Sequence, residues 1–309
     1  MKILVADDDS ISRTLMKRTL EKFGYEVDLA ENGRVAAEIL TRIDGPRLAL
    51  VDWMMPELDG PGLCREMRSL HRKGGYVYIV LLTSKHDSQD IVAGLNAGAD
   101  DYITKPCHPA ELRARLHTGC RILSLEGELV RARDEMHYKA THDALTGIWN
   151  RPSILSQMKV ELERSARDNA PASILLCDID HFKQVNDKFG HLAGDLVLQE
   201  VAKRLTKSVR SYDAVGRYGG EEFLILLKDC DDSTLEARSE YVRLAVAAGP
   251  ITAGTEELKI SVSVGAAGCR RWEIGAPIER ILARADAALY RAKAEGRNRT
   301  GLAGELTTV

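Results

Sequence analysis

Short apolar runs alternate with helical patterns over the first 120 residues of the chain. The runs read KILVAD, YEVDLA, LALVD, VYIVLLT and DYITK. Short, almost wholly apolar runs that each lead into a helix are typical of parallel strands, because such strands are buried on both faces. The pattern therefore predicts a domain over 1–120 of the α/β class, with a five-stranded parallel sheet doubly wound by helices.

A pattern with steps of three and four residues connects this region to the rest of the chain. After Leu112 and Leu116 begin it, the apolar positions of this seam are Ile122, Leu125, Leu129, Ala132 and Met136. Such spacing is typical of a two-stranded coiled coil, which would make the protein a homodimer. The seam covers only about two heptads, so a helix that packs on its own domain is the alternative. We expect a helical linker over 121–140.

The remaining segment, 141–309, is expected to form a second domain. It opens with cap and turn residues in THDALTGIWNRPS, and a helix is predicted to begin near Ser153. A buried strand is expected over 173–177. The stretch GRYGGEEFLILL predicts two strands joined by a hairpin turn at Gly219 and Gly220.

Composition changes this picture little. A chain of 309 residues is longer than a single hydrophobic core usually supports, which agrees with two domains. The net charge of -3 gives no reason to expect nucleic acid or an anionic membrane as a partner. The six cysteines are scattered singly, as in proteins with reduced thiols. Neither a leader nor an apolar stretch of membrane-spanning length is evident, so we expect a cytoplasmic protein.

Polar residues follow the predicted strands of the first domain where a ligand site is expected in such folds. Asp7, Asp8 and Asp9 come after the first strand and Asp52 after the third. The run of three aspartates by itself also fits a solvated loop that caps the next helix. With Asp52 added, the converging carboxylates favour a site for a hard cation such as Mg²⁺. Thr83 and Lys105 end two further strands and could contact an anion built on Asp52.

The stretches VADDDS, LALVDWMMPELDG, LLTSK and YITKPCHPAEL together resemble the receiver domain of two-component response regulators, over the whole of 1–120. The resemblance implies a flavodoxin-like fold in which Asp52 accepts phosphate from a histidine kinase and Asp7, Asp8 and Asp52 hold Mg²⁺. It also implies that Thr83 and Lys105 contact the phosphoryl group. Tyr102 would be the switch aromatic, or else simply a half-buried aromatic of a strand.

Carboxylates also gather in the second domain. Asp178 and Asp180 follow the predicted buried strand, and they point the same way only if the strand is still regular there. Glu221 and Glu222 directly follow the predicted hairpin turn. A cross-strand Asp178 beside them would be unfavourable without a cation, and Gly219 and Gly220 would let a bound group approach the backbone. Acidic residues from neighbouring strands are typical of two-metal phosphoryl or nucleotidyl transfer, although a plain Gly-Gly hairpin is the alternative.

Four blocks in order resemble the GGDEF domain of diguanylate cyclases, here in a GGEEF form: DALTGIWNR, DIDHFKQVNDKFGHLAGD, RYGGEEF and ADAALYRAKAEGRNR. The resemblance covers about 141–300. It implies an α+β fold similar to nucleotidyl cyclases, with a central antiparallel sheet ringed by helices. It also implies the reaction, which condenses two GTP to cyclic di-GMP and two diphosphates in a homodimer.

The same resemblance implies roles for individual residues. Asp178, Glu221 and the backbone carbonyl of Ile179 would bind Mg²⁺, two ions per active site, with Mn²⁺ as a possible substitute. Glu222 would be a second metal-binding or catalytic carboxylate. The remaining substrate-binding residues would be Asn186 and Asp195 for the guanine edge, and Lys183, Lys293 and Arg297 for the triphosphate.

The stretch RSYD, residues 210–213, lies five residues ahead of the GGEEF motif. This is the family's spacing for the RxxD site that binds product and inhibits the enzyme. By the resemblance, Arg210 and Asp213 would bind cyclic di-GMP, although an ordinary surface ion pair is the alternative. A further arginine of this site is expected from the helix STLEARSEYVRLAV, either Arg238 or Arg243.

Three functions are consistent with these residues. The preferred one is a diguanylate cyclase controlled by phosphorylation at Asp52 and inhibited by its product. A second is a catalytically silent protein that binds cyclic di-GMP at Arg210 and Asp213 and signals by contact. A third is the synthesis of a mixed or adenine-containing cyclic dinucleotide. Asp195 weakens it, because a carboxylate can accept hydrogen bonds from N1–H and the amino group of guanine, whereas adenine has no donor at N1.

Overall fold

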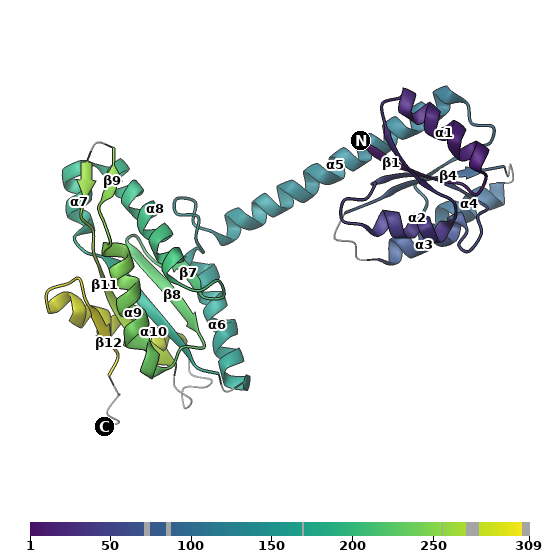
Figure 1. The fold of residues 1–309 in the computed structure, drawn as a ribbon. Coiled ribbons are helices and arrows are strands. Elements are labelled where there is room, and N and C mark those ends of the chain that lie inside the picture. The colour runs from purple at the N-terminus through teal and green to yellow at the C-terminus, as the bar shows by residue number, and fades with distance from the viewer. Residues whose placement is uncertain (71–74, 85–87, 169, 255, 270–277, 305–309) are drawn as a thin grey trace. The chain divides into compact units, whose positions relative to one another are not determined.

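A computed structural model describes residues 1–70, 75–84, 88–168, 170–254, 256–269 and 278–304 of the chain. The chain divides into two compact units, Met1–Asp134 and Glu135–Val309 (Figure 1). Helix α5 (Pro109–Thr141) belongs in part to each unit. The division therefore falls inside one continuous helix.

The first unit alternates strands and helices along the chain (Figure 1). Its strands are β1 (Lys2–Ala6), β2 (Glu26–Ala30), β3 (Leu48–Asp52), β4 (Tyr78–Thr83) and β5 (Asp101–Thr104). Its helices before α5 are α1 (Ser10–Lys22), α2 (Gly33–Thr41), α3 (Gly60–Ser69) and α4 (Ser88–Asn96). The strands form one parallel sheet in the order β2-β1-β3-β4-β5, which confirms the predicted doubly wound α/β class.

Apolar side chains cover both faces of this sheet, as the strand pattern predicts. Leu20 of α1 and Leu112 and Leu116 of α5 pack on one face. Leu40 of α2 and Leu63 of α3 pack on the other. Because β1 and β3 are parallel neighbours, their carboxyl ends lie at the same edge of the sheet.

Helix α5 extends far beyond the sheet on which it begins. Leu112, Leu116 and Leu123 are buried, whereas Leu125 is 57% exposed and Leu129 and Met136 are each 71% exposed. The linker helix predicted over 121–140 is thus the second part of a longer helix. Leu123 and Glu126 still contact the first unit, whereas Leu125, Leu129 and Met136 of the predicted seam are exposed in the single chain.

The second unit is built around an antiparallel sheet. Its strands are β6 (Ala172–Ile179), β7 (Ala214–Arg217), β8 (Glu222–Lys228), β9 (Ile251–Ala253), β10 (Glu256–Leu258), β11 (Val262–Cys269) and β12 (Thr300–Leu302). Its helices are α6 (Arg151–Asp168), α7 (Phe182–Phe189), α8 (His191–Ser208), α9 (Asp232–Ala247) and α10 (Ile278–Ala294). The main sheet has the order β12-β11-β6-β8-β7, with only the β11–β12 pair parallel. Strands β9 and β10 form a separate antiparallel pair.

Helices cover both faces of the main sheet. Val185 of α7, Val197 of α8 and Val242 of α9 belong to one core. Met158 of α6 and Leu289 of α10 belong to the other. The α+β arrangement agrees with the predicted fold. Among the described residues, no helix combines the length and apolarity that a membrane span requires.

Candidate functional sites

Three carboxylates meet at the carboxyl edge of the first sheet. One oxygen each from Asp7, Asp8 and Asp52 lies within 4.8 Å of the others. Asp9 has a different task, because its side chain accepts hydrogen bonds from the backbone N–H groups of Ile11 and Ser12 and caps α1. The run of three aspartates therefore serves both the acidic cluster and the helix cap.

Lys105 lies against this cluster. Its Nζ is 2.6 Å from Oδ1 of Asp52 and 2.9 Å from Oδ2 of Asp7. Burial raises the pKa of Asp52, and hydrogen bonding and charge from Lys105 only partly offset this. A set of oxygen ligands with one lysine beside it fits a hard divalent cation such as Mg²⁺. The buried Thr83 ends β4, and Tyr102 lies partly buried on β5, so both stand where the sequence predicts them.

In the second unit, a hairpin places two glutamates beside β6. The backbone N–H groups of Tyr218 and Gly219 donate to the carbonyl oxygen of Glu222, at 2.8 and 3.2 Å. This closes the turn that contains Gly219 and Gly220, and the predicted hairpin is confirmed. Strand β6 continues to Ile179, two residues beyond the predicted strand, and pairs Asp178 directly with Glu222. Directly opposed residues of an antiparallel pair have their side chains on the same face of the sheet, so the carboxylates of Asp178 and Glu222 lie next to each other on one face.

The electrostatics of this corner show carboxylates close enough to repel one another. Burial, followed by the charge of Asp178, raises the pKa of both Glu221 and Glu222. Burial also raises the pKa of Asp178, although Lys293 Nζ lies 2.7 Å from its Oδ2. A donor set made of carboxylate oxygens fits Mg²⁺ or Mn²⁺. Ile179 joins the corner through its backbone N–H, which donates to the carbonyl of Glu221 at 3.3 Å.

The glycines of the turn lie close to functional groups. A Cβ on Gly219 would lie 2.4 Å from Oε2 of Glu222, so a side chain there would displace this carboxylate. The carbonyl of Gly220 accepts hydrogen bonds from Nε and Nη2 of Arg217, at 3.2 and 2.8 Å. The turn is therefore fixed by Arg217 as well as by the strand pairing.

Helices α7 and α8 bring the two predicted guanine-binding residues into the same region. Asn186 lies on α7, and its Oδ1 is 1.9 Å from where a Cβ on Gly194 of α8 would stand. Gly194 precedes Asp195, which is half-buried at the start of α8. The absence of a side chain at Gly194 lets the Asn186 amide approach α8 at the residue before Asp195.

The predicted phosphate-binding cations differ in how close they lie to the acidic corner. Lys293 contacts Asp178 directly, and its hydrogen bond and charge, followed by the charge of Arg297, partly offset the rise in the pKa of Asp178 that burial causes. Lys183 is exposed at the start of α7. Among the hydrogen bonds and ion pairs of the described residues, none joins Lys183 to Asp178, Glu221 or Glu222.

The RSYD segment forms a network whose carboxylate is buried. The Asp213 side chain is 1% exposed and accepts from the backbone N–H groups of Arg210 and Lys228, at 2.9 and 3.0 Å. Arg238 Nη2 lies 2.8 Å from the same carboxylate, whereas Arg243 is held elsewhere by Glu240 and Asn298. Of the two candidate arginines, Arg238 is therefore the one beside the RxxD segment, and Asp213 orients its partners rather than facing solvent.

Sequence reasoning missed a clamp that links the start of the second domain to the Gly219–Gly220 turn. Asp143 accepts from Thr146 and forms a salt bridge with Arg217 Nη1, at 3.2 Å, while Arg217 holds Gly220. Burial by itself raises the pKa of Asp143, but the Thr146 hydrogen bonds and the Arg217 charge bring it below the ordinary value. The sequence analysis expects cap and turn residues in this stretch, but it gives no signal for the pairing of Asp143 with Arg217, which lies 74 residues further along the chain.

Comparisons with known proteins agree with this division of the chain. Residues 3–117 match the family described as response regulator receiver domain, and residues 140–299 match the diguanylate cyclase, GGDEF domain. The response regulator PleD of Caulobacter vibrioides is 34% identical over 253 residues, which are 81% of this chain and 55% of PleD. The diguanylate cyclase DgcP of Pseudomonas aeruginosa is 37% identical over 215 residues, 68% of this chain and 32% of DgcP.

A solved structure resembles the second half of the chain. It contains the coiled coil and GGDEF domain of DgcB from Caulobacter crescentus in complex with cyclic di-GMP. Its sequence is 29% identical, the TM-score is 0.55, and the match covers 62% of this chain and 99% of that chain. In contrast, the matched part of this chain spans 55% of PleD and 32% of DgcP, so it corresponds to only part of these curated relatives.

Proposed function

Because this chain belongs to the GGDEF-domain family of diguanylate cyclases and carries a response regulator receiver domain, we propose that it synthesises cyclic di-GMP under phosphorylation control. The proposed reaction joins two GTP molecules and releases two diphosphates. Each 3'-hydroxyl attacks the α-phosphorus of the other nucleotide.

One observation carries the proposal. The β6–β8 register sets Asp178 opposite Glu222, with Glu221 adjacent and Lys293 in contact. Burial, and after it the charge of Asp178, raises the pKa of Glu221 and Glu222, and such perturbed groups are typical of functional sites. A plain hairpin would not need three carboxylates and a lysine at one corner.

The residues of the site have separate tasks in this proposal. Asn186 and Asp195 hold the guanine edge, and Lys183, Lys293 and Arg297 neutralise the triphosphate. Asp178, Glu221 and the carbonyl of Ile179 would hold two Mg²⁺ ions, with Glu222 as a further catalytic carboxylate. When bound, Mg²⁺ makes the 3'-hydroxyl more acidic and offsets charge in the transition state.

Catalysis in this scheme requires two GGDEF domains that face each other, because each holds one GTP. The exposed apolar seam of α5 supports a homodimer, since Leu125, Leu129 and Met136 are uncovered in the single chain. Phosphorylation of Asp52 by a histidine kinase would then act by changing which dimeric arrangement is populated. Lys105 and Thr83 would contact the phosphoryl group, and Tyr102 would respond to it.

Incubation of the purified protein with GTP and Mg²⁺, followed by mass spectrometry of the nucleotides, tests the activity. We expect cyclic di-GMP from the unsubstituted protein and none from Glu221→Gln. Glu163→Gln, at an exposed position on α6, is the matched control and should retain activity. Failure to form product under activating conditions would favour the silent cyclic di-GMP-binding protein. A mixed product when ATP and GTP are offered together would contradict the guanine assignment.

Beryllofluoride, a phosphoryl analogue, tests the receiver's part. It should raise the rate of cyclic di-GMP formation by at least about fivefold, within the usual range of coupling free energies. Asp52→Asn should remove this response but keep the basal rate. Equal responses of the two proteins would exclude control through Asp52.

We further propose product inhibition at the RxxD segment. Arg210 is exposed, and Arg238 is oriented by the buried Asp213, so their guanidinium groups can bind phosphate or stack on guanine. Arg210→Ala should raise the half-inhibitory concentration of cyclic di-GMP about tenfold. Arg167→Ala, at an exposed position on α6, should leave this concentration unchanged. Unaltered inhibition in Arg210→Ala would refute the assignment.

A further inference from the structure

A turn with unfavourable backbone geometry follows α10. Gly296, Arg297 and Asn298 have φ angles of +117°, +62° and +45°. For Arg297 this left-handed region is unfavourable, because the Cβ atom approaches the backbone, whereas asparagine adopts it more readily. Two such residues in succession persist only where surrounding contacts hold them.

The backbone N–H of Arg297 donates to the carbonyl of Ala292 at 3.0 Å, at the end of α10. A second set of contacts joins the turn to Asp180. Its Oδ2 accepts from the backbone N–H of Asn298 at 3.0 Å and from Oγ of Ser261 at 2.6 Å. Its Oδ1 accepts from Oγ of Ser263 at 2.6 Å. Asp180 is 6% exposed and Ser263 is fully buried. Charge-assisted hydrogen bonds in such a place are stronger than neutral ones.

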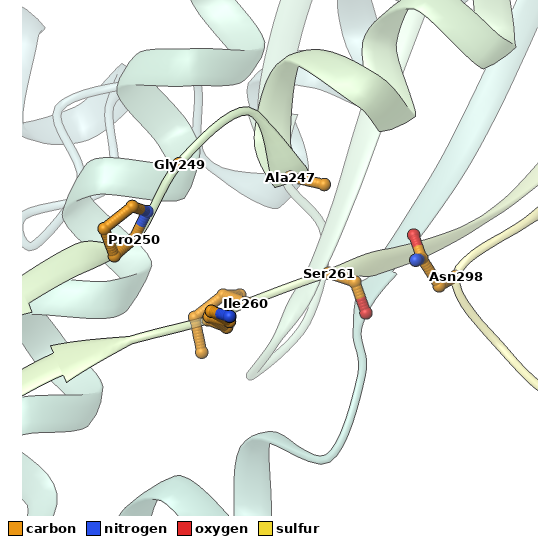
Figure 2. Close-up of a pocket in the computed structure, with 7 residues that line it drawn as sticks. Ala247, Gly249, Pro250, Ile260, Ser261 and Asn298 are labelled. Atoms are coloured by element: carbon orange, nitrogen blue, oxygen red, sulfur yellow. The ribbon is translucent and has the colours of Figure 1, made fainter.

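Hydrogen bonds rather than apolar packing fix the side of the turn that bears Asn298. Figure 2 shows Ser261 and Asn298 at one end of a pocket, with Gly249 and Pro250 at the other. The pocket has a volume of about 350 Å³. Asn298 Oδ1 also accepts from Arg243, which Glu240 holds in turn. Because the space beside Asn298 is open, the bonds to Asp180 and Arg243 restrain the turn.

The turn matters because Arg297 precedes the anchored Asn298. Lys293, on the last turn of α10, lies 2.7 Å from the carboxylate of Asp178, and Arg297 follows four residues later, just beyond the end of the same helix. We infer that Asp180 is a positioning residue that holds the turn so that Arg297 faces the triphosphate subsite. This inference rests on the proposed function. The two aspartates of the Asp-Ile-Asp segment then divide their work, with Asp178 in the acidic corner and Asp180 supporting the cationic side.

Hydrogen exchange tests the anchoring without any nucleotide. In Asp180→Asn, the amides of a peptide that covers 295–300 should exchange at least about tenfold faster than in the unsubstituted protein. Ser263→Ala, a milder change, should act in the same direction. Asp168→Asn, a matched substitution at the exposed end of α6, should leave the exchange unchanged. Equal exchange in Asp180→Asn and the unsubstituted protein would overturn the inference.

A double-mutant cycle tests the consequence for substrate. Titration calorimetry measures the affinity for an α,β-methylene analogue of GTP in the presence of Mg²⁺. Asp180→Asn and Arg297→Ala should each weaken binding by about tenfold, and the double variant by little more than either. Independent, multiplying effects would overturn the positioning role. If the unsubstituted protein binds no analogue, the proposed function fails, and hydrogen exchange still decides whether Asp180 holds the turn.

Discussion

At the scale of single residues, Glu222 lies where its negative charge opposes folding. Its pKa is raised in the folded protein, first by burial and then by Asp178. A carboxyl group with a raised folded pKa favours folding while it is protonated. This contribution is lost as the pH rises through the folded pKa.

We predict that Glu222→Gln increases the free energy of unfolding at pH 8 in EDTA, although it lowers cyclic di-GMP synthesis at least about hundredfold. At a pH below the ordinary glutamate pKa of about 4.3, the stabilisation should disappear, because Glu222 is then neutral in both states. Urea unfolding at the two pH values measures the change. Equal stabilisation at both would contradict the electrostatic cause, and Glu163→Gln serves as control.

The sequence indicated the type and position of some site residues, but not the direction in which their side chains point. Asp52 and Glu221 could be assigned because strand ends and a turn restrict where their side chains stand. Asp178 and Asp180 look alike in sequence, yet only one joins the glutamates, because β6 ends at Ile179 and the chain then turns toward β11. Asp213 was predicted as a ligand-binding group, and its burial depends on Lys228 and Arg238 from elements distant in the sequence.

At the scale of elements, the Asp143–Arg217–Gly220 clamp holds the β7–β8 hairpin. The pKa of Asp143 is lowered in the folded protein, chiefly by Thr146 and Arg217 acting against burial. A carboxyl group with a lowered folded pKa stabilises the fold above its unfolded pKa. This stabilisation is lost as the pH falls through the folded value.

Asp143→Asn should therefore lower the free energy of unfolding by about 1 kcal/mol at pH 7, the scale of a partly buried pair with hydrogen bonds. The difference should shrink as the pH falls below about 4. Chemical denaturation between pH 3.5 and 7 checks this. Asp168→Asn, at an exposed helix end, provides the comparison. A pH-independent loss would mean that the amide disturbs packing rather than charge.

The predicted elements agree best with the structure where a pattern repeats over many residues. The five strands of the first unit lie where the apolar runs predict them, and the signal is continuous in the central strands β1, β3 and β4, which are buried on both faces. The β9–β10 pair was not predicted, since strands of three residues are too short for periodicity to show. The bridge between Trp149 and Gly216 joins segments distant in the sequence, so no local pattern could predict it.

At the scale of the whole molecule, activity should depend on the seam of α5. The double substitution Leu125→Glu and Leu129→Glu places like charges on a line that we expect two chains to share. It should convert the protein to a monomer and lower cyclic di-GMP formation at least about tenfold. Light scattering and the rate at matched protein concentrations measure both effects. Arg131→Glu, off the seam, is the control, and a monomeric unsubstituted protein would contradict the dimer.

In each of its two units, the protein provides its own counter-ion. Lys105 bridges Asp52 and Asp7, and Lys293 contacts Asp178. A metal cation that binds these carboxylates would displace the lysine, whose ammonium group could then bind a phosphate. A phosphate that binds the lysine first would likewise leave the carboxylates free to bind a cation. Metal and phosphate should then strengthen each other's binding by the same factor, since such linkage is reciprocal. Both sites would fill by an exchange of ions rather than by simple addition.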